Sequence, residues 1–376
     1  MRVLHLLKTA EGATWAFRQI NELIGLGAEI AVALPEGKMA DKYRQNGVRV
    51  YTFKFGLSTI IKPSEYKKLD QIIADFRPDL IHSHFFVTTL FARSHKTFLR
   101  SQIPVVFQVP GPLHLEHPLF RTIDLHSAGK QDYWIATCSW TKQTYIQHGV
   151  KPDRVFMSFY GSDLNEIKKH PPGKLRQELA LEKDDFIVAM VANMYKPKKY
   201  LGQKRGLKGH EDFFEAIAEC VKQNPRIKAV VVGGAWDGAV DYEKELVAMG
   251  KSLCGDNIFF LGTRRDVPEL YADINIVVHP SHSENLGGAA ESLLMSVPTI
   301  ATNVGGFPDI VNDGVTGYLV PPANPQALAK CILKGFTDYN KMLEMAKEGF
   351  LRTKDVLDIR NNAIEVFSVY RKILNK

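Results

Sequence analysis

The first half of the chain alternates short apolar runs, rich in β-branched residues, with longer helical patterns. Pro78 and Pro104 each stand just before such a run, where a proline ends the preceding helix. This alternation predicts a parallel sheet with helices on both faces. The expected strands are 2–7, 28–33, 48–53, 80–84, 105–109, 133–137 and 155–159, and the expected helices lie near 14–26, 64–76 and 88–100.

A second alternating series follows a polar segment, 164–182. That segment contains Pro171-Pro172-Gly173, which breaks regular structure and indicates a linker. The series beyond it predicts a second doubly wound parallel sheet. Its expected strands are 186–191, 229–232, 258–261, 274–279 and 299–301, with helices near 211–223, 242–254, 267–271 and 288–295.

The predicted organisation is therefore α/β, with one Rossmann-like domain over 1–163 and another over 183–357. Residues 358–376 form an expected amphipathic helix with Ile364, Phe367, Tyr370 and Ile373 at helical spacing. Ligands bind such sheets outside the carboxyl ends of the strands. Two facing domains would then share one cleft.

Composition narrows the class of protein. The 376 residues are 45% hydrophobic and 24% charged, as in a globular protein, and no apolar run reaches the length of a membrane span. The opening apolar stretch meets Lys8 too soon for a secretory signal, so a cytoplasmic location is expected. Four separated cysteines are expected to be reduced thiols. The net charge of +7 permits an anionic partner, although no nucleic-acid-binding motif is present.

The segment 279–298 carries the strongest candidate chemistry, because it follows an expected strand and opens a helix. Gly287 and Gly288 would let backbone approach a ligand closely, and free amides at a helix start favour phosphate. Glu284 lies in the loop and Glu291 about a turn inside the helix. Two carboxylates beside phosphate suggest acceptors for sugar hydroxyls. The alternative is one capping and one solvent-facing glutamate.

A second candidate loop, 191–210, also joins a strand to a helix and contains six basic residues. Fixed cations and helix starts can offset the negative charge of a diphosphate leaving group without a metal. Lys208 lies nearest the helix. For any single lysine of this loop, the alternative is a solvated surface position.

Together with the segments 299–311 and 313–317, the run 279–298 resembles the signature of the retaining family 4 glycosyltransferases, which have the GT-B fold. The resemblance implies two Rossmann-like domains facing a cleft and a C-terminal helix that returns to the first domain. Glu284 to Glu291 is one residue shorter than the family's spacing, whereas Glu291 to Pro298 keeps it.

By this resemblance, Glu291 would hold the ribose of a donor nucleotide, and Glu284, with its neighbours Asn285 and Leu286, would face the donor sugar. Lys208-Gly209 matches the Lys-Gly that contacts the donor phosphates. The family's arginine after the preceding strand is missing. The residues in its place or near enough to substitute for it are Asn193, Met194, Lys196 and Arg205.

In the first domain, the loop 8–15 contains Gly12, where the family has a glycine-rich loop near the diphosphate. His82 and His84 end a strand on one face, a spacing that could suit a metal, but no third ligand follows at a diagnostic distance. The resemblance instead places His84 beneath the acceptor cleft. In the family the strand 105–109 leads into a catalytic-region histidine, but Gln108-Val-Pro-Gly-Pro stands there in this chain. His114 and His117 lie a few residues further on, and each could point into the cleft or be an ordinary loop histidine.

The expected activity is transfer of a hexosyl unit from a UDP- or GDP-linked donor to a glycan or lipid-linked glycan, in cell-surface polysaccharide synthesis. Lys208, Glu284 and His84 are the candidate catalytic residues. The chain has no D-x-D motif, so no metal or other cofactor is expected. A sugar-nucleotide epimerase and a non-catalytic nucleotide-sugar-binding protein are the alternatives.

The acceptor cannot be identified from the chain, but its first domain offers a candidate membrane-binding surface. Basic residues on its helices could contact an anionic lipid surface on the inner face of the membrane, or could be ordinary solvated positions. These residues are Lys67, Lys68, Arg93, Lys96 and Arg100.

Overall fold

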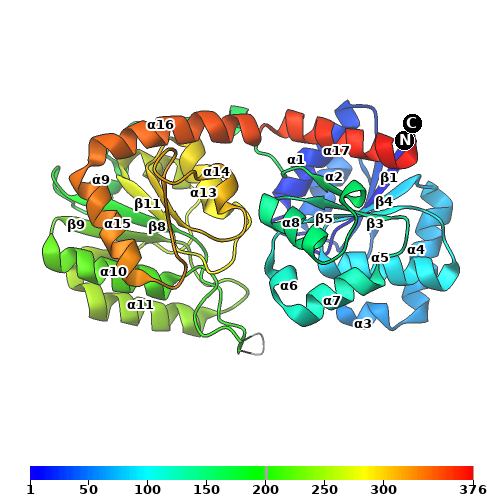
Figure 1. The fold of residues 1–376 in the computed structure, drawn as a ribbon, viewed down its shortest axis with the longest axis horizontal. Coiled ribbons are helices and arrows are strands. Elements are labelled where there is room, and N and C mark those ends of the chain that lie inside the picture. Colours follow the sequence, from blue (N-terminus) through cyan, green and yellow to red (C-terminus); the bar gives the residue numbers. More distant parts are fainter. Residues whose placement is uncertain (200–201, 376) are drawn as a thin grey trace. The chain divides into compact units, whose positions relative to one another are not determined.

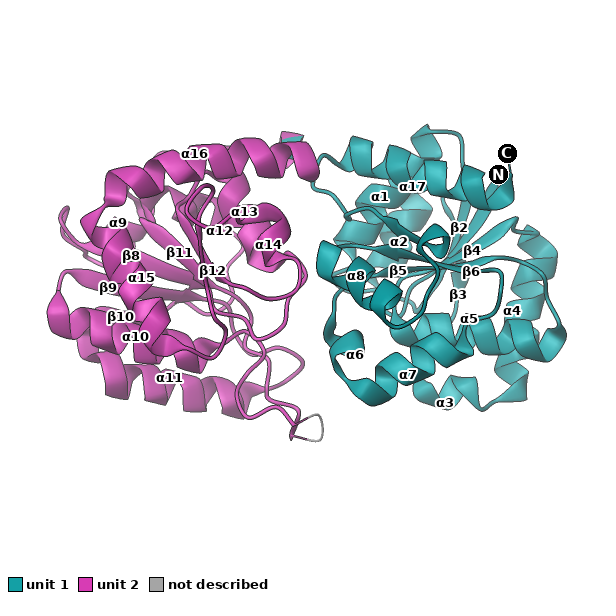
Figure 2. Ribbon diagram, viewed as in Figure 1, with its two compact units in different colours: residues 1–164, 357–376 teal, residues 165–356 magenta. Residues whose placement is uncertain are grey.

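A computed structural model describes residues 1–199 and 202–375. The chain forms two compact units (Figure 2). Unit 1 comprises Met1–Leu164 and the segment from Leu357 onward, and unit 2 comprises Asn165–Val356. In both units a parallel sheet lies between layers of helices, as the alternating sequence predicted (Figure 1).

Unit 1 contains a seven-stranded sheet in the order β3-β2-β1-β4-β5-β6-β7, with every pair parallel. Its central strands are almost completely buried because helices cover both faces of the sheet, and they include polar residues such as His5, His82 and Gln108. The strands are β1 (Arg2–Leu6), β2 (Glu29–Leu34), β3 (Arg49–Thr52), β4 (Leu80–Ser83), β5 (Val105–Val109), β6 (Asp132–Ala136) and β7 (Val155–Met157).

The helices of unit 1 include several short ones that the sequence pattern did not predict. The helices are α1 (Thr14–Gly25), α2 (Lys38–Gln45), α3 (Leu57–Ile60), α4 (Pro63–Phe76), α5 (Phe86–Leu99), α6 (Leu113–Glu116), α7 (Pro118–Ser127), α8 (Ser139–Gln147), the 3₁₀ turn η1 (Pro152–Arg154) and α17 (Ile359–Leu374).

Helix α17 packs on α1 and on the sheet of unit 1, although it is the last element of the chain. The buried face differs from the expected one, because Ile364 is 50% exposed. Tyr370 is fully buried, as predicted, while Phe367 and Ile373 are partly buried at the edge of the core. Ala363, Val366 and Val369 form the centre of the face instead. Small and β-branched residues suit this close approach to α1, and Ile364 points to the solvent side.

Unit 2 contains a six-stranded parallel sheet in the order β10-β9-β8-β11-β12-β13. The chain order reverses between β8 and β11, which is where ligands bind in open sheets of this kind. The strands are β8 (Phe186–Val191), β9 (Ile227–Val232), β10 (Ile258–Phe260), β11 (Ile276–His279), β12 (Thr299–Thr302) and β13 (Tyr318–Val320). The helices are α9 (Lys174–Glu178), α10 (His210–Gln223), α11 (Val240–Cys254), α12 (Val267–Leu270), α13 (Gly287–Leu294), α14 (Phe307–Ile310), α15 (Pro325–Thr337) and α16 (Tyr339–Val356), with 3₁₀ turns η4 (Gly255–Asn257) and η5 (Tyr271–Asp273). A further 3₁₀ turn, η2 (Leu164–Glu166), lies at the boundary of the units.

The predicted linker, 164–182, needs correction because much of it is an ordered part of unit 2. It contains α9, whose Leu175 is fully buried in the unit's core. Asp273 accepts backbone hydrogen bonds from Gly173 (2.7 Å) and Leu175 (2.8 Å), which satisfies amides at the helix start. Pro171-Pro172-Gly173 therefore precedes a helix instead of marking a free connection.

Within the described residues, no helix has both the length and the apolar character needed to cross a lipid bilayer.

Candidate functional site

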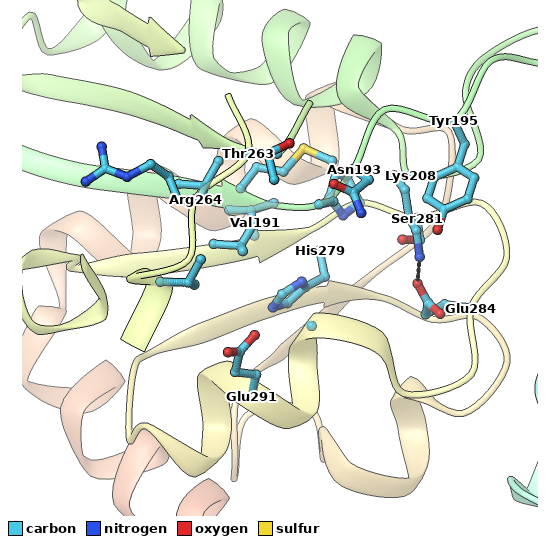
Figure 3. A pocket seen from close by; sticks show the side chains of 18 residues that line it. Val191, Asn193, Tyr195, Lys208, Thr263, Arg264, His279, Ser281, Glu284 and Glu291 are labelled. Carbon is cyan, nitrogen blue, oxygen red and sulfur yellow. Dashed lines mark hydrogen bonds and ion pairs between the residues drawn. The ribbon is translucent and has the colours of Figure 1, made fainter. Parts of the chain in front are cut away.

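A pocket opens at the carboxyl ends of the central strands of unit 2 (Figure 3). Four strand ends contribute to it, because residues within three positions of the ends of β8, β9, β10 and β11 line its wall. Its lining consists of Met190, Val191, Ala192, Asn193, Tyr195, Lys208, Val232, Gly233, Thr263, Arg264, Val267, Val278, His279, Pro280, Ser281, Glu284, Gly288 and Glu291.

The start of α13 borders this pocket, and its two glycines are required by close packing. Gly287 has a φ of +43°, and an added Cβ would lie 2.6 Å from Cδ of Glu284. At Gly288 a Cβ would lie 2.9 Å from Cε1 of His279 and 3.3 Å from the carbonyl oxygen of Val191. The absence of side chains lets the β8 and β11 loops approach the helix start. Free amides there favour an anion.

Lys208 and Glu284 form an ion pair within the pocket, drawn as a dashed line in Figure 3. Both side chains are largely buried, with 17% and 13% of their surfaces exposed. The ammonium also lies 5.5 Å from the centre of the Tyr195 ring. Burial opposes the charged form of Lys208, but the charge and hydrogen bond of Glu284 outweigh it and raise the pKa of the lysine. Lys208 is thus a permanent cation with one carboxylate partner.

Glu291 projects from α13 into another part of the pocket. The hydroxyl of Tyr271 donates to its Oε2 at 3.4 Å. Burial raises the pKa of Glu291, and this hydrogen bond offsets only part of the effect. A partly buried carboxylate with one long hydrogen bond has capacity to accept others, and hydroxyl groups of a ligand would supply them.

Gly209 fixes the loop that carries Lys208. Its φ is +74°, and a Cβ at this position would lie 2.0 Å from the carbonyl oxygen of Pro280. The backbone amide of His282 donates to the carbonyl of Leu207 at 2.9 Å. The β11–α13 loop therefore packs directly on the Lys208 loop, which holds Lys208 and Glu284 within reach of each other.

We expect unit 2 to lose stability as the pH falls below about 6.5. Burial lowers the pKa of His279 to about 3, assisted by the charge of Lys208, and lowers that of His210 to about 4. Both imidazoles stay neutral when folded but take up protons near pH 6.5 when unfolded. The free energy of unfolding is therefore highest above that pH. By about pH 5.5, proton uptake by each unfolded histidine lowers it by about 1.4 kcal/mol.

Urea unfolding at about pH 7.5 and 5.5 tests this expectation with His210→Gln, since His210 does not line the pocket. The variant should lose about 1.4 kcal/mol less on acidification than the parent. An unchanged pH dependence would show that His210 is not held neutral.

Five of the predicted donor-binding residues come together in this pocket: Asn193, Lys208, Glu284, Gly288 and Glu291. Asn285, Leu286 and Gly287 lie next to it but not in its lining. Arg205 is elsewhere, because its guanidinium pairs with Asp212 (2.5 Å) and Glu215 (2.7 Å).

Arg205 is therefore not placed to substitute for the missing family arginine, and Lys196 is exposed outside the lining. Arg264, from the loop after β10, does line the pocket, but it is already bound to Glu178 and Asp266. Lys208 consequently carries the positive charge next to the start of α13.

Sequence reasoning missed Tyr195, His279 and Ser281 as lining residues. All three lie at or just beyond a strand end, as β8 ends at Val191 and β11 at His279. The strand boundaries were predicted, so the carboxyl-end rule could have found these residues. All three lie within the candidate segments 191–210 and 279–298, but neither charge nor a specific role singled them out there.

The remaining predicted site residues belong to unit 1. Gly12 is exposed in the loop between β1 and α1, with a φ of +69°. His84 is fully buried, and its Nδ1 lies 2.9 Å from the hydroxyl of Tyr160. The Trp15 ring lies against both His84 and Tyr160. In this structure His84 is an interior residue of unit 1.

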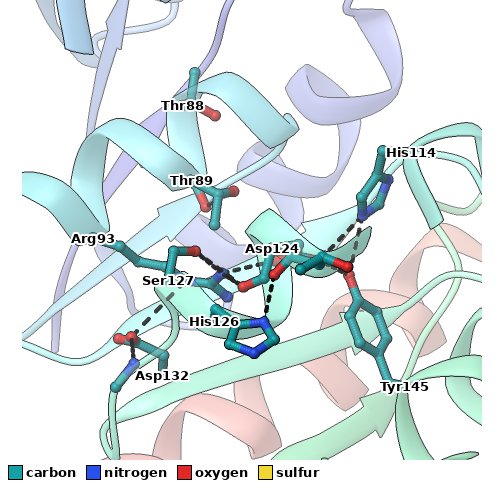
Figure 4. Close-up of polar contacts among 12 residues, drawn as sticks. Thr88, Thr89, Arg93, His114, Asp124, His126, Ser127, Asp132 and Tyr145 are labelled. Carbon is teal, nitrogen blue, oxygen red and sulfur yellow. Dashed lines mark hydrogen bonds and ion pairs between the residues drawn. The ribbon is translucent and has the colours of Figure 1, made fainter. Parts of the chain in front are cut away.

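His114 contacts a buried polar cluster (Figure 4). Its Nε2 lies 3.2 Å from Oδ2 of Asp124 and 3.3 Å from the Tyr145 hydroxyl. Arg93 donates to Oδ1 of Asp124 at 2.7 Å. Burial would raise the pKa of Asp124, but the Arg93 charge and the contacts of His114 and Tyr145 bring it down to about 2. The cluster is a permanently ionised carboxylate with three partners.

The prediction of a membrane-facing basic surface was wrong for two residues, Arg93 and Lys96. Arg93 is 1% exposed and is bound inside the unit, and Lys96 pairs with the buried Asp132 at 2.9 Å. Both side chains serve internal ion pairs because α5 packs against α7 and β5. Lys67, Lys68 and Arg100 are exposed, as expected.

Comparisons with known proteins agree with this architecture. The model described as Glycosyl transferases group 1 matches residues 173–352, and the model described as Glycosyltransferase Family 4 matches residues 12–165. Among solved structures, Alr3699/HepE of Anabaena in complex with UDP-glucose superposes with a TM-score of 0.82 at 24% identity, over 99% of this chain and 100% of that one. At that identity the likeness shows a shared GT-B fold.

Curated relatives match a smaller part of the chain. The lipopolysaccharide core biosynthesis mannosyltransferase LpsB of Rhizobium meliloti is 26% identical over 184 residues, covering 47% of this chain and 52% of the relative. A D-inositol 3-phosphate glycosyltransferase of Frankia alni is 30% identical over 186 residues, covering 47% of this chain and 43% of the relative. These matches span about half the length of either relative.

Since the two family models account for most of both units, the chain belongs to the group 1 glycosyl transferases, with a family 4 glycosyltransferase unit at its N-terminal end.

Proposed function

We propose that the chain transfers a hexosyl unit from a nucleotide-diphosphate sugar, UDP- or GDP-linked, to a glycan or lipid-linked glycan in cell-surface polysaccharide synthesis. The observation that carries the proposal is the buried Lys208–Glu284 pair beside the glycine-rich start of α13. The printed names of the relatives support the class of reaction, since they include a mannosyltransferase and glycosyltransferases. HepE was solved with UDP-glucose, which supports a nucleotide-linked donor.

The pocket offers a separate group for each part of such a donor. The diphosphate would lie at the start of α13, where free amides and Lys208 meet its charge. Phosphate would then compete with Glu284 for the ammonium. Glu284 would be released to accept a hydroxyl of the sugar, while Glu291 would accept the ribose hydroxyls. Lys208 and Glu284 therefore act as partners only until the donor binds.

The proposed transfer retains the configuration of the sugar and proceeds on one face. The bond between the anomeric carbon and the departing phosphate oxygen breaks, and the acceptor oxygen bonds to the same carbon. The acceptor proton passes to the departing phosphate, so no protein base is required. Lys208 and the α13 amides stabilise the charge that develops on the phosphate, and the proposed chemistry needs no metal.

A panel of UDP-, GDP- and ADP-sugars tests the proposal with the purified protein. Slow release of free nucleoside diphosphate, accelerated by a glycan acceptor, is the expected result. Interconversion of the sugar without release would indicate the epimerase. Binding without any turnover would indicate a binding protein. Either of these outcomes contradicts the proposal.

Replacing Glu291 by Gln should weaken nucleoside diphosphate binding by about tenfold, which corresponds to about 1.4 kcal/mol. The amide keeps the size of the side chain but loses the charge that strengthens a hydrogen bond from a hydroxyl. Titration calorimetry measures the change. If Glu291 holds the ribose, the corresponding 2′,3′-dideoxy nucleotide should bind parent and variant equally. A tenfold difference with that ligand too would contradict the assigned role.

We also propose that the chain associates peripherally with the inner face of the cell membrane. Leu57, Ile61 and Phe98 are 66%, 79% and 71% exposed, and α3 packs on α5, which ends beside Phe98. Exposed cations lie close by: Lys62 follows Ile61, Arg100 follows α5, and Lys67 and Lys68 are on α4, whose Tyr66 stacks on Phe98. Exposed apolar side chains with basic residues near them suit an anionic lipid surface.

The variant Phe98→Ser should no longer co-sediment with anionic vesicles. Equal sedimentation with neutral and anionic vesicles would contradict the charge-dependent contact.

A further inference from the structure

Three histidines of unit 1 gather on one face of its sheet, far from the pocket residues in sequence. The parallel register pairs His5 of β1 with His82 of β4. His84 follows His82 by two residues and therefore lies on the same face. The sequence offered only the pair His82 and His84, since the third histidine is 77 positions earlier and becomes a neighbour only through strand pairing.

The three imidazoles are in direct contact. Nδ1 of His5 lies 2.8 Å from Nε2 of His84. The ring centres are 4.2 Å apart for His82 and His84, 4.7 Å for His5 and His82, and 5.1 Å for His5 and His84. One nitrogen from each ring lies within 4.8 Å of the other two. All three side chains are completely buried.

Nε2 of His5 has no hydrogen-bond partner among the described residues. Nε2 of His82 makes no contact with full hydrogen-bond geometry there either, although the Gln108 side chain lies beside His82. A buried polar atom without a hydrogen bond costs about 1–3 kcal/mol. Two such atoms in one cluster therefore call for a ligand that the protein atoms do not supply.

Outer contacts orient the rings, as they do around metal-binding histidines. The hydroxyl of Tyr370, on α17, contacts Nδ1 of His82. The hydroxyl of Tyr160 lies 2.9 Å from Nδ1 of His84 and donates to the carbonyl of Gln108 at 3.1 Å. With their Nδ1 atoms occupied, His82 and His84 have only Nε2 to offer toward the centre of the cluster.

We propose that His5, His82 and His84 bind a transition-metal ion of the zinc, cobalt or copper type. Neutral imidazole suits these ions, whereas magnesium and calcium prefer oxygen ligands, and no carboxylate belongs to the cluster. Zinc–nitrogen bonds of about 2.0–2.1 Å place tetrahedral ligand atoms roughly 3.3 Å apart. The rings must therefore shift by about 1 Å or more at their widest separation, and the ion replaces the His5–His84 hydrogen bond.

The ion would have a structural role. It would join β1 to β4 and, through Tyr370, fix α17 to the sheet of unit 1. None of the three histidines lines the pocket of unit 2.

Metal analysis of the untagged full chain, purified without chelators and then dialysed with and without chelator, tests the site. We expect about one equivalent of zinc or cobalt per chain, a visible cobalt spectrum with nitrogen ligation, and a higher Tm with metal than without. Tyr370→Phe removes the hydroxyl that orients His82 but keeps the packing, so it should fold. It should bind zinc about 10–100-fold more weakly.

His5→Asn should abolish binding, and His95→Gln is the matched control, since His95 is a buried histidine of unit 1 outside the cluster. The control should bind zinc like the parent. The proposal is overturned if the parent chain does not hold about one equivalent of metal. It is also overturned if the parent, Tyr370→Phe and His5→Asn bind zinc with equal affinity.

Discussion

Replacing Lys208 by Ala should lower turnover at least a hundredfold. The ammonium lies at the start of α13, where the proposed mechanism develops negative charge on the leaving phosphate. Losing one preorganised partner of such a charge costs about 10²–10³ in rate. Single-turnover kinetics with a saturating nucleotide sugar measure the loss. Lys204→Ala is the matched control, because Lys204 belongs to the same loop but is exposed outside the pocket lining. It should retain nearly full activity.

A second variant distinguishes a catalytic role of Lys208 from the effect of leaving the Glu284 charge unpaired. Lys208→Ala leaves Glu284 largely buried without its cation, which by itself disfavours binding of an anionic donor. Combining it with Glu284→Gln removes that unpaired charge. If Lys208 acts on the leaving phosphate, the double variant stays slow. Recovery to near-normal turnover would show instead that the lysine serves only to neutralise Glu284.

Replacing Gly209 by Ala should destabilise unit 2 by several kcal/mol and weaken donor binding with it. The new Cβ would lie 2.0 Å from the carbonyl oxygen of Pro280, a backbone atom that cannot move without shifting the β11–α13 loop. Strain from the positive φ adds about 1–2 kcal/mol. Because this loop carries Glu284 and leads into α13, the pocket itself would be displaced.

Gly238→Ala isolates the contribution of backbone strain. Gly238 has almost the same φ, +75°, and open space around its Cβ position. Its variant should lose only about 1–2 kcal/mol. Chemical unfolding of both variants measures the difference. If Gly209→Ala and Gly238→Ala are equally stable, the packing of the two loops is looser than the structure indicates.

Much of the fold could be predicted from the sequence because buried parallel strands leave a strong apolar signal. The strands β5 and β8 have the predicted bounds, and the expected strand positions of both sheets are occupied. The hydrophobic pattern did not predict elements that are short or that begin in a polar segment. β13 has three residues, and α9 follows two prolines within the expected linker. Its burial depends on Asp273, about a hundred residues later, which no local pattern reveals.

The residues of the donor pocket could be predicted where local sequence patterns or motifs mark them. Glycines at a helix start indicated Gly288, and the family resemblance singled out Lys208 among the six basic residues of its loop; both line the pocket. The pairing of Lys208 with Glu284 was not predictable, because it depends on the close approach of two loops 76 residues apart. Arg205 lies outside the pocket for a more local reason, since its guanidinium pairs with Asp212 and Glu215, which follow it closely on α10. The environment of His84 depends on strand register.

The central claim is that the pocket of unit 2 binds a nucleoside diphosphate through Lys208 and the α13 amides. Isothermal titration calorimetry with UDP and GDP on the parent and Lys208→Ala tests it most directly. One nucleotide should bind the parent at a single site and bind the variant at least tenfold more weakly, with the corresponding nucleoside binding both equally. No heat with either nucleotide, or equal affinity for parent and variant, would contradict the account.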